Sequence, residues 1–299
     1  MAAKIEVQVE GRRLQLSNLD KPLYPNGFRK AQVIDYYTRI APAILPHLRG
    51  RPLTLKRYPD GVDSGYFYEK NCPKHRPAFV QTVAVYSHGN QRDVNYCVVD
   101  DLPSLVWAAN LASLELHTSL SRGDDVARPT MLVLDLDPGP PATIVECCRV
   151  ALWAREILDE LKLVSLPKTS GSKGLQLYIP LNTAVSYDVT KTFARTLARQ
   201  LEHAHGDLVV SSMKKELRRG KVLVDWSQND DHKTTVSVYS LRARERPTAS
   251  TPVRWEEVEG CAGKADPALL VFDSDAVLAR VEKHGDLFEP VLRLKQSVG

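Results

Sequence analysis

The sequence lacks the long apolar run and the leader pattern that mark membrane and secreted proteins. No apolar stretch in its 299 residues approaches the length needed to cross a bilayer. Residues 1–7 show no basic segment followed by an apolar one, so they do not resemble a signal peptide. We therefore expect a cytoplasmic protein with no membrane partner.

Cysteine is scarce, and the five cysteines form no recognisable framework. None forms a Cys-x-x-Cys pair, and their number is odd. This pattern favours reduced thiols over a disulfide framework. Residues 72–75, Cys-Pro-Lys-His, have half of a zinc-binding spacing without a second half, so we expect no structural zinc.

Internal repeats, low-complexity segments and clear linkers are also missing. The hydrophobic fraction of 43% and the charged fraction of 25% are ordinary for a globular protein. We expect one compact domain over residues 1–299. It would comprise an N-terminal module at 1–125, a core at 126–245 and a peripheral helical tail at 246–299.

Helical and strand patterns are mixed along the chain, which predicts an α+β fold. Strands are expected in a hairpin over 4–16, then at 52–58, 79–86, 93–99, 114–118, 130–137, 163–166, 175–179, 221–225 and 234–240. The strands at 79–86 and 93–99 would join through His88 to Asn90. Helices are expected at 30–47, 103–113, 143–161, 187–204, 253–259 and 273–283.

Positive charge is concentrated in two blocks. Residues 1–60 carry eleven Lys and Arg against five Asp and Glu, and residues 211–246 carry nine against five. Residues 250–299 carry six against nine, a net charge of −3. This distribution suggests a polyanionic partner on one side of the molecule, although ordinary solvated charge is the alternative.

Carboxylates stand at the ends of two apolar strands. Residues 130–139 contain an apolar run that leads to Asp135 and Asp137, and Pro138-Gly139 follows as a turn. On a strand these two carboxylates share one face, roughly 6–7 Å apart, which leaves room for a divalent cation. Asp225 ends a second apolar strand and would complete a two-metal site for Mg²⁺ or Mn²⁺. Solvated strand ends are the alternative, because Asp-x-Asp alone is a weak pattern.

Residues 169–174, Thr-Ser-Gly-Ser-Lys-Gly, form a small glycine-rich turn between two strands. Its backbone N–H groups could form an anion-binding concavity, with Ser170, Ser172 and Lys173 as further donors. The spacing of a Walker loop is absent, and a plain hairpin turn is the alternative. His117, Arg242 and Lys56 lie on or after apolar strands and could also bind phosphate, or could be structural.

Aromatic and basic residues also suggest contact with nucleic acid. Phe67 and Tyr68 stand beside Lys70 and could stack on unpaired bases, although the residues alone favour core packing. Further candidates for phosphate contacts are Lys21, Lys30 and Arg218, any of which could instead be solvated.

Four motifs in this order resemble the polymerase domain of bacterial ligase D, in the archaeo-eukaryotic primase–polymerase superfamily. They are Asp135-Leu-Asp137, residues 169–174, Val224-Asp-Trp-Ser-Gln-Asn229 and Tyr239-Ser-Leu-Arg242. The similarity runs from Leu16 to about His284. It implies a primase–polymerase core with an RRM-like sheet, packed against an N-terminal α/β module.

The resemblance also implies roles for single residues. Metal-binding carboxylates would be Asp135, Asp137 and Asp225, holding two Mn²⁺ or Mg²⁺ ions. Residues at the incoming nucleotide would be Lys56, His117, Ser170, Ser172, Lys173, Gln228 and Arg242. Residues at the DNA would be Asn18, Lys21 and Lys30 near a 5′-phosphate, and Phe67, Tyr68, Lys70 and Arg218 near the template. Position 68 is Tyr where the family pattern has Phe, a change that keeps the stacking face.

The resemblance implies a template-directed nucleotidyltransferase that adds NTPs or dNTPs at gaps or 3′ ends of broken DNA, with a preference for ribonucleotides. Ku and a separate DNA ligase would be partners in end joining or excision repair. We find no Lys-x-Asp-Gly ligase motif and no zinc knuckle of replicative primases, so we expect a stand-alone relative or an excised domain. Alternatives are a non-catalytic DNA-end bridging factor and a metal-dependent sugar transferase.

Overall fold

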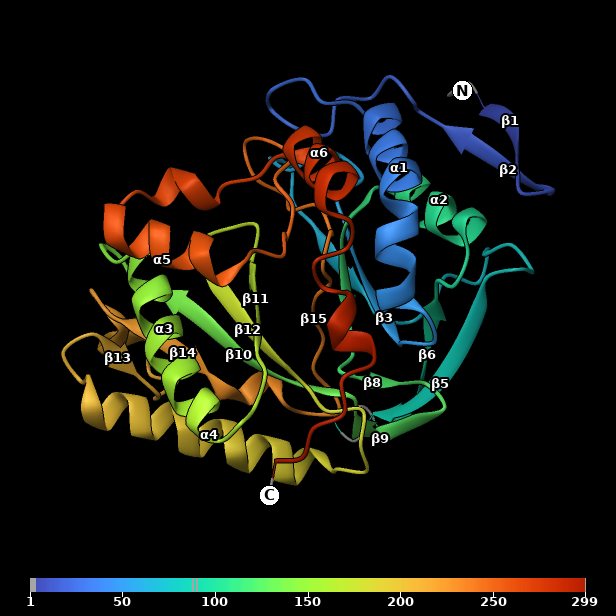
Figure 1. Cartoon of the computed structure of the whole chain (residues 1–299). Coiled ribbons are helices and arrows are strands. Elements are labelled where there is room, and N and C mark those ends of the chain that lie inside the picture. The colour runs from blue at the N-terminus through green and yellow to red at the C-terminus, as the bar shows by residue number, and fades with distance from the viewer. Residues whose placement is uncertain (1–3, 88, 90, 299) are drawn as a thin grey trace. The chain divides into compact units, whose positions relative to one another are not determined.

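The computed structural model describes residues 4–87, 89 and 91–298, and the chain in it folds into two compact units (Figure 1). Unit 1 comprises residues 1–124, 234–249 and 273–285, and unit 2 comprises residues 125–233, 250–272 and 286–299. His88 and Asn90, in the predicted connection between two strands, lie outside the described residues. Within the described ranges, no helix is both long and apolar enough to cross a bilayer.

Unit 1 is built on a six-stranded sheet in the order β15-β7-β3-β6-β5, with β4 paired to β3. A separate hairpin of β1 and β2 precedes it. The elements of unit 1 are β1 (Lys4–Val9), β2 (Arg12–Ser17), α1 (Lys30–Leu48), β3 (Leu53–Arg57), β4 (Phe67–Glu69), β5 (Gln81–Ser87), β6 (Arg92–Val98), α2 (Leu102–Asn110), β7 (Ser113–Thr118), β8 (Ser121–Arg122), β15 (Thr235–Val236) and α6 (Ser274–His284).

Helix α1 forms because apolar residues recur along it at helical spacing. Val33, Tyr37 and Ile40 are fully buried, which confirms the predicted inward face. The two buried tyrosines also satisfy their hydroxyls. Tyr36 donates to the carbonyl of Tyr239 at 2.7 Å, and Tyr37 donates to the carbonyl of Leu114 at 2.7 Å. These bonds tie α1 to β7 and to the segment after β15.

Unit 2 is built on a five-stranded sheet in the order β11-β12-β10-β14-β13, antiparallel except for the β13–β14 pair. Its elements are β9 (Asp125–Pro129), β10 (Met131–Pro138), α3 (Ile144–Glu160), β11 (Leu166–Thr169), β12 (Leu175–Pro180), α4 (Tyr187–Ala204), β13 (Val209–Val210), η1 (Lys215–Arg218), β14 (Val222–Asp225), η2 (Trp226–Gln228), α5 (Trp255–Lys264), η3 (Pro267–Leu270) and η4 (Glu289–Leu292). Together the two units confirm the predicted α+β class.

Strand β10 sends alternate residues to opposite faces of the unit 2 sheet. Leu132, Leu134 and Leu136 are fully buried in a core shared with α3 and α4. Asp135 and Asp137 therefore lie on the other face, Asp135 partly buried and Asp137 exposed. The predicted alternation is confirmed, and it places two carboxylates at the end of the central strand.

Two predicted strands differ from the structure for local reasons. The strand expected at 163–166 begins only at Leu166, because α3 ends in a Schellman motif that uses Leu163. Lys162 is left-handed (φ +58°), and the Leu163 N–H donates to the carbonyl of Leu158 at 2.8 Å. The strand expected at 234–240 covers only Thr235–Val236, and Tyr239 is left-handed (φ +63°), a conformation that ends extended structure.

The thiol prediction was wrong for one pair of cysteines. Cys72 and Cys97 form a disulfide, whereas Cys147, Cys148 and Cys261 are free and buried. The N–H of Cys72 donates to the carbonyl of Asn95 at 2.6 Å, so the chain after β4 runs along β6. The two cysteines are 25 positions apart, so their pairing has no short-range spacing that a sequence pattern could reveal.

The C-terminal segment does not stand apart from the units. Residues 273–285 belong to unit 1, and 250–272 and 286–299 belong to unit 2. Val258 and Cys261 of α5 are fully buried in the core of unit 2. The expected tail at 246–299 thus supplies core residues rather than a peripheral layer.

Candidate metal and nucleotide site

The three predicted metal ligands lie together on two neighbouring strands of unit 2. We call Asp135, Asp137 and Asp225 the carboxylate triad. Asp135 of β10 faces Asp225 of β14 directly in the antiparallel register, and Asp137 faces Leu223 two residues further on. Directly opposed residues have Cβ atoms about 4.5–5.5 Å apart. The fold therefore brings carboxylates separated by 88 or more positions in the sequence into one cluster.

The electrostatics of the triad favour a bound cation. Burial, then the charge of Asp137 and less strongly that of Asp225, raises the pKa of Asp135 to about 8. Such a carboxyl keeps its charge more easily when a cation neutralises the repulsion. Asp225 is already oriented by three donors: the Ser227 N–H at 2.8 Å, the Ser227 hydroxyl at 2.6 Å and the Gln228 side-chain amide at 2.9 Å. Gln228, predicted in the nucleotide pocket, thus contacts a triad carboxylate.

Sequence reasoning missed a buried lysine, Lys168, which lies in register with Asp135 across the intervening strand β12. Lys168 of β11 is fully buried and donates to the Gln176 side-chain carbonyl at 2.5 Å and to the Ser250 hydroxyl at 2.7 Å. Gln176 of β12 faces Lys168 on one side and Asp135 on the other. Its amide hydrogen-bonds Asp135, and both this bond and the Lys168 charge act to lower the pKa of Asp135. The only sequence feature that could have indicated Lys168 was a lysine inside the short strand Leu-Pro-Lys-Thr.

The glycine-rich turn at residues 169–174, which we call the phosphate loop, packs against the end of β10. The Ser170 hydroxyl accepts the N–H groups of Ser172 at 3.2 Å and Gly174 at 3.1 Å. A Cβ placed on Gly174 would lie 2.2 Å from the Leu136 carbonyl oxygen, so only glycine permits this approach. Lys173 is exposed and Ser172 partly so. The loop is thereby held next to β10, which carries Asp135 and Asp137.

Arg218 lies beside the turn that ends β10. A Cβ on Gly139 would lie 1.9 Å from the Arg218 carbonyl oxygen. The guanidinium of Arg218 donates to the carbonyl of Met213 at 2.6 Å. The second basic block of the sequence therefore brings the backbone of one basic residue against the turn that follows β10.

The other predicted phosphate-binding residues form a separate cluster in unit 1. We call Lys56, His117 and Arg242 the basic cluster. All three side chains contact one carboxylate, Glu115 of β7, which is 2% exposed. Burial lowers the pKa of Lys56 and of His117, and Glu115 opposes both effects. Sequence reasoning missed Glu115, whose only signal was an acidic residue inside an apolar strand.

Three tyrosine rings surround the Lys56 ammonium. It lies 4.1 Å from the Tyr66 centroid, 5.3 Å from Tyr58 and 5.5 Å from Tyr68. The Tyr68 ring also packs edge-on to His117, with centroids 6.0 Å apart. Cation–π contacts of this kind stabilise the ammonium group over the faces of the rings.

The predicted template aromatics are exposed rather than buried in a core. Phe67 is 44% exposed and Tyr68 is 54% exposed. As neighbours on β4 they point to opposite sides, Tyr68 toward the basic cluster and Phe67 over the guanidinium of Arg57 at 5.1 Å. Lys70 follows them and is also exposed.

The predicted 5′-phosphate residues lie close together at the start of α1. The Lys21 N–H donates to the Asn18 carbonyl at 3.0 Å, and the Lys30 N–H donates to the Lys21 carbonyl at 2.9 Å. The Lys21 ammonium pairs with Asp60 at 2.6 Å, and the Lys30 ammonium donates to the Ser17 carbonyl at 2.7 Å. Burial, with Arg57 and Lys21 nearby, lowers the pKa of Lys30 to about 8. Two lysines and one asparagine are thus tied to a single loop.

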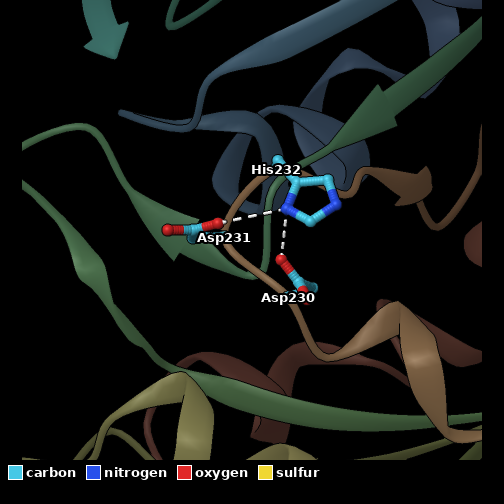
Figure 2. A group of neighbouring side chains, drawn as sticks. All are labelled: Asp230, Asp231 and His232. Carbon is cyan, nitrogen blue, oxygen red and sulfur yellow. Dashed lines mark hydrogen bonds and ion pairs between the residues drawn. The ribbon is translucent and has the colours of Figure 1, made fainter. Parts of the chain in front are cut away.

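Figure 2 shows another cluster with metal-ligand chemistry, Asp230, Asp231 and His232. Within the described residues, this is the one set of three acidic, histidine or cysteine side chains whose ligand atoms lie within 4.8 Å of one another, so the triad does not meet that distance. Asp230 already pairs with Lys191 and with His232. Hydrogen bonding from Lys191 and the charge of His232 outweigh burial and lower the pKa of Asp230. An ion-pair network accounts for this cluster.

Comparisons with known proteins show which family the chain is similar to. The family model described as LigD, primase-polymerase domain, matches residues 29–288. The multifunctional non-homologous end joining protein LigD of Mycolicibacterium smegmatis is 41% identical over 282 residues, which cover 93% of this chain and 36% of that protein. The bifunctional LigD of Bacillus subtilis is 33% identical and is covered to 45%. The chain therefore spans less than half the length of these relatives.

A solved structure is also similar over most of the chain. The polymerase domain from Mycobacterium tuberculosis ligase D, in complex with DNA, aligns with a TM-score of 0.87 at 40% identity. The alignment covers 94% of this chain and 98% of that domain. With the family match over most of its length, the chain belongs to the LigD primase–polymerase domain family, whose members are nucleotidyltransferases.

Proposed function

We propose that this chain is a template-directed nucleotidyltransferase that fills gaps or extends 3′ ends at DNA breaks. The observation that carries the proposal is the register of Asp135 opposite Asp225, with Asp137 at the end of the same strand and the phosphate loop packed against it. Carboxylates beside a loop of phosphate donors are the arrangement that nucleotidyl transfer needs.

The donor set of the triad suits two divalent cations, Mg²⁺ or Mn²⁺. All three side chains offer only carboxylate oxygens, which hard cations prefer. Burial, followed by repulsion from Asp137, raises the pKa of Asp135, and a bound cation would offset both effects. Bound cations would activate a 3′-hydroxyl and neutralise charge on the leaving pyrophosphate. Asp135, Asp137 and Asp225 would hold them.

We propose that phosphate oxygens of the incoming nucleotide bind the phosphate loop of unit 2, through Ser170, Ser172 and Lys173. The basic cluster of unit 1, Lys56, His117 and Arg242, is proposed separately as a phosphate-binding site. Charge-assisted hydrogen bonds of this type are the strongest that side chains offer to phosphate. Gln228 would act through Asp225, which it already contacts at 2.9 Å. A preference for ribonucleotides is part of the proposal and rests on the family resemblance.

DNA would be held by two groups of residues. Asn18, Lys21 and Lys30 lie close together at the start of α1 and could bind a 5′-phosphate. The exposed rings of Phe67 and Tyr68 could stack on unpaired template bases. Lys70 and Arg218 would add backbone contacts. Because the relatives are named for non-homologous end joining, we place the activity in that pathway, with Ku and a separate DNA ligase as partners.

A gap-filling assay with labelled NTPs and dNTPs, with and without Mn²⁺, tests this function. Asp225→Ala should lower incorporation by a factor of about 10³ or more, because it removes a proposed metal ligand directly. Asp231→Ala is the matched control, since Asp231 is an exposed carboxylate outside the triad. Incorporation that survives Asp225→Ala would contradict the triad. Salt-sensitive binding to 5′-phosphorylated gaps with no incorporation by the wild-type protein would instead indicate a DNA-end bridging factor.

A further inference from the structure

Five donor groups surround the carboxylate of Glu115 in unit 1. Its Oε2 accepts from His117 Nε2 at 2.9 Å and lies 3.3 Å from Arg242 Nε. Its Oε1 accepts from Lys56 Nζ at 3.3 Å, from the Tyr58 hydroxyl at 3.3 Å and from the Ala243 N–H at 3.2 Å. The donors come from β3, from β7 and from the chain after β15.

Such a carboxylate stays ionised although it is 2% exposed. Burial alone would raise the pKa of Glu115, but the hydrogen bond from His117 and the charges of Arg242 and Lys56 hold it well below its usual range. A buried charge is tolerated when opposite charges and donors surround it. Glu115 is therefore a fixed negative centre for the side chains around it.

An ionised carboxylate also determines which nitrogen of His117 carries the proton. A carboxylate only accepts hydrogen bonds, so the Nε2 that contacts it must be protonated. Nδ1 is then the nitrogen left to face another group, and it can donate to an anion only when the imidazole is charged. The charged groups around His117 are Glu115, Arg242 and Lys56.

We propose that Glu115 is a positioning residue that holds the basic cluster in one arrangement for phosphate oxygens of a nucleotide. This inference rests on the proposed function, because it takes the basic cluster as a phosphate site. Preorganised donors bind an anion better than mobile ones, since the ordering of long side chains has already occurred. With three basic side chains around one carboxylate, the cluster also keeps a positive excess whenever Lys56 is charged.

A simple counter-charge would have the opposite effect on binding. Replacing Glu115 with glutamine removes a negative charge, which by Coulomb's law alone should tighten the binding of a polyanion. If Glu115 positions the cluster, the same change should weaken binding by roughly ten-fold, since charge-assisted hydrogen bonds are lost. The sign of the change separates the two roles.

The test is calorimetric titration of Glu115→Gln and the wild type with ATP and with inorganic tripolyphosphate, without divalent cations. Glu69→Gln is the control, because Glu69 is a part-buried carboxylate of the same sheet that pairs with Arg57 at 2.7 Å. We expect weaker binding for Glu115→Gln alone. Unchanged or tighter binding by Glu115→Gln, or an equal loss in Glu69→Gln, overturns the inference.

A second measurement does not depend on the variant folding. Nitrogen-15 NMR of wild-type His117 should show the Nε2–H tautomer, and in Glu115→Gln the pKa of His117 should fall further below its ordinary value. The Nδ1–H tautomer in the wild type overturns the inference. If the wild-type protein fills no gaps and Glu115→Gln still loses polyphosphate affinity, that pair of results supports the positioning role and contradicts the proposed polymerase.

Discussion

Each unit combines a cluster of like charges with one buried ion of the opposite charge. In unit 2, the buried ion is Lys168, which lies in register with Asp135 of the triad across Gln176. In unit 1, the buried ion is Glu115, which three basic side chains contact. Glu115 is bonded directly to its neighbours and stays ionised. The hydrogen bonds from Lys168 to Asp135 run through Gln176, and the pKa of Asp135 remains raised, at about 8.

This difference indicates how much each cluster would be stabilised by a bound ligand. Direct hydrogen bonds neutralise the buried charge of Glu115 within the fold, whereas the relay from Lys168 leaves the triad with uncompensated repulsion. The triad would therefore gain most from an added cation. The basic cluster needs no ligand to hold its shape, which suits a preformed phosphate site.

The largest effect is expected from Asp135→Asn. It should lower nucleotide incorporation by about 10³-fold, because a proposed metal ligand loses its charge. It should also raise the free energy of unfolding at pH 7 by about 1–2 kcal/mol, since burial and the charge of Asp137 disfavour the ionised carboxylate. Gap filling and urea unfolding measure the two quantities. A lower free energy of unfolding for Asp135→Asn than for the wild type would contradict the proposed cost of ionising Asp135 beside Asp137.

The two buried carboxylates should respond to pH in opposite directions. The raised pKa of Asp135 means that its ionisation costs stability as pH rises from about 4 to about 8. The depressed pKa of Glu115 means that its contribution is present above the unfolded pKa and is lost as pH falls below about 4.3. Urea unfolding of Asp135→Asn and Glu115→Gln between pH 3 and pH 9 should therefore remove slopes of opposite sign. Equal slopes in both variants would break the comparison.

A smaller effect is expected from Lys168→Met, which removes the counter-charge while keeping an unbranched apolar chain. The quantity to compare is the Mn²⁺ affinity of the variant and of the wild type, measured by electron paramagnetic resonance. We expect a fall of about ten-fold, because Gln176 loses the partner that orients its amide toward Asp135. Arg51→Met is the control, since Arg51 is a buried cation of unit 1 bonded to backbone carbonyls. Unchanged Mn²⁺ affinity in Lys168→Met would contradict the relay.

Periodicity in the sequence was sufficient to predict most elements and part of the site. The alternation through residues 130–137 placed Leu134 and Leu136 in a core and Asp135 and Asp137 on the opposite face, as the structure has them. Side-chain direction follows from backbone geometry, so it can be read locally. The triad ligands and their roles were predicted from resemblance and remain a proposal.

Features that depend on neighbouring strands could not be predicted. Lys168, Gln176 and Asp135 are aligned only by the order β11-β12-β10, and Glu115 meets Arg242 across 127 positions of sequence. The Cys72–Cys97 disulfide depends in the same way on the pairing of chain segments near β6. Register between distant strands results from packing of the whole unit and has no local signature.

The sequence by itself determined which segments form helices and strands, which face of each is apolar, and that carboxylates end two apolar strands. These follow from side-chain chemistry and periods of 3.6 and 2 residues. Only the tertiary structure decided that Asp135 would face Asp225, and that the triad and the basic cluster would each have a buried ion of opposite charge. Burial in a folded core makes single charges strong enough to shift a pKa, and no linear pattern records which charges are buried together.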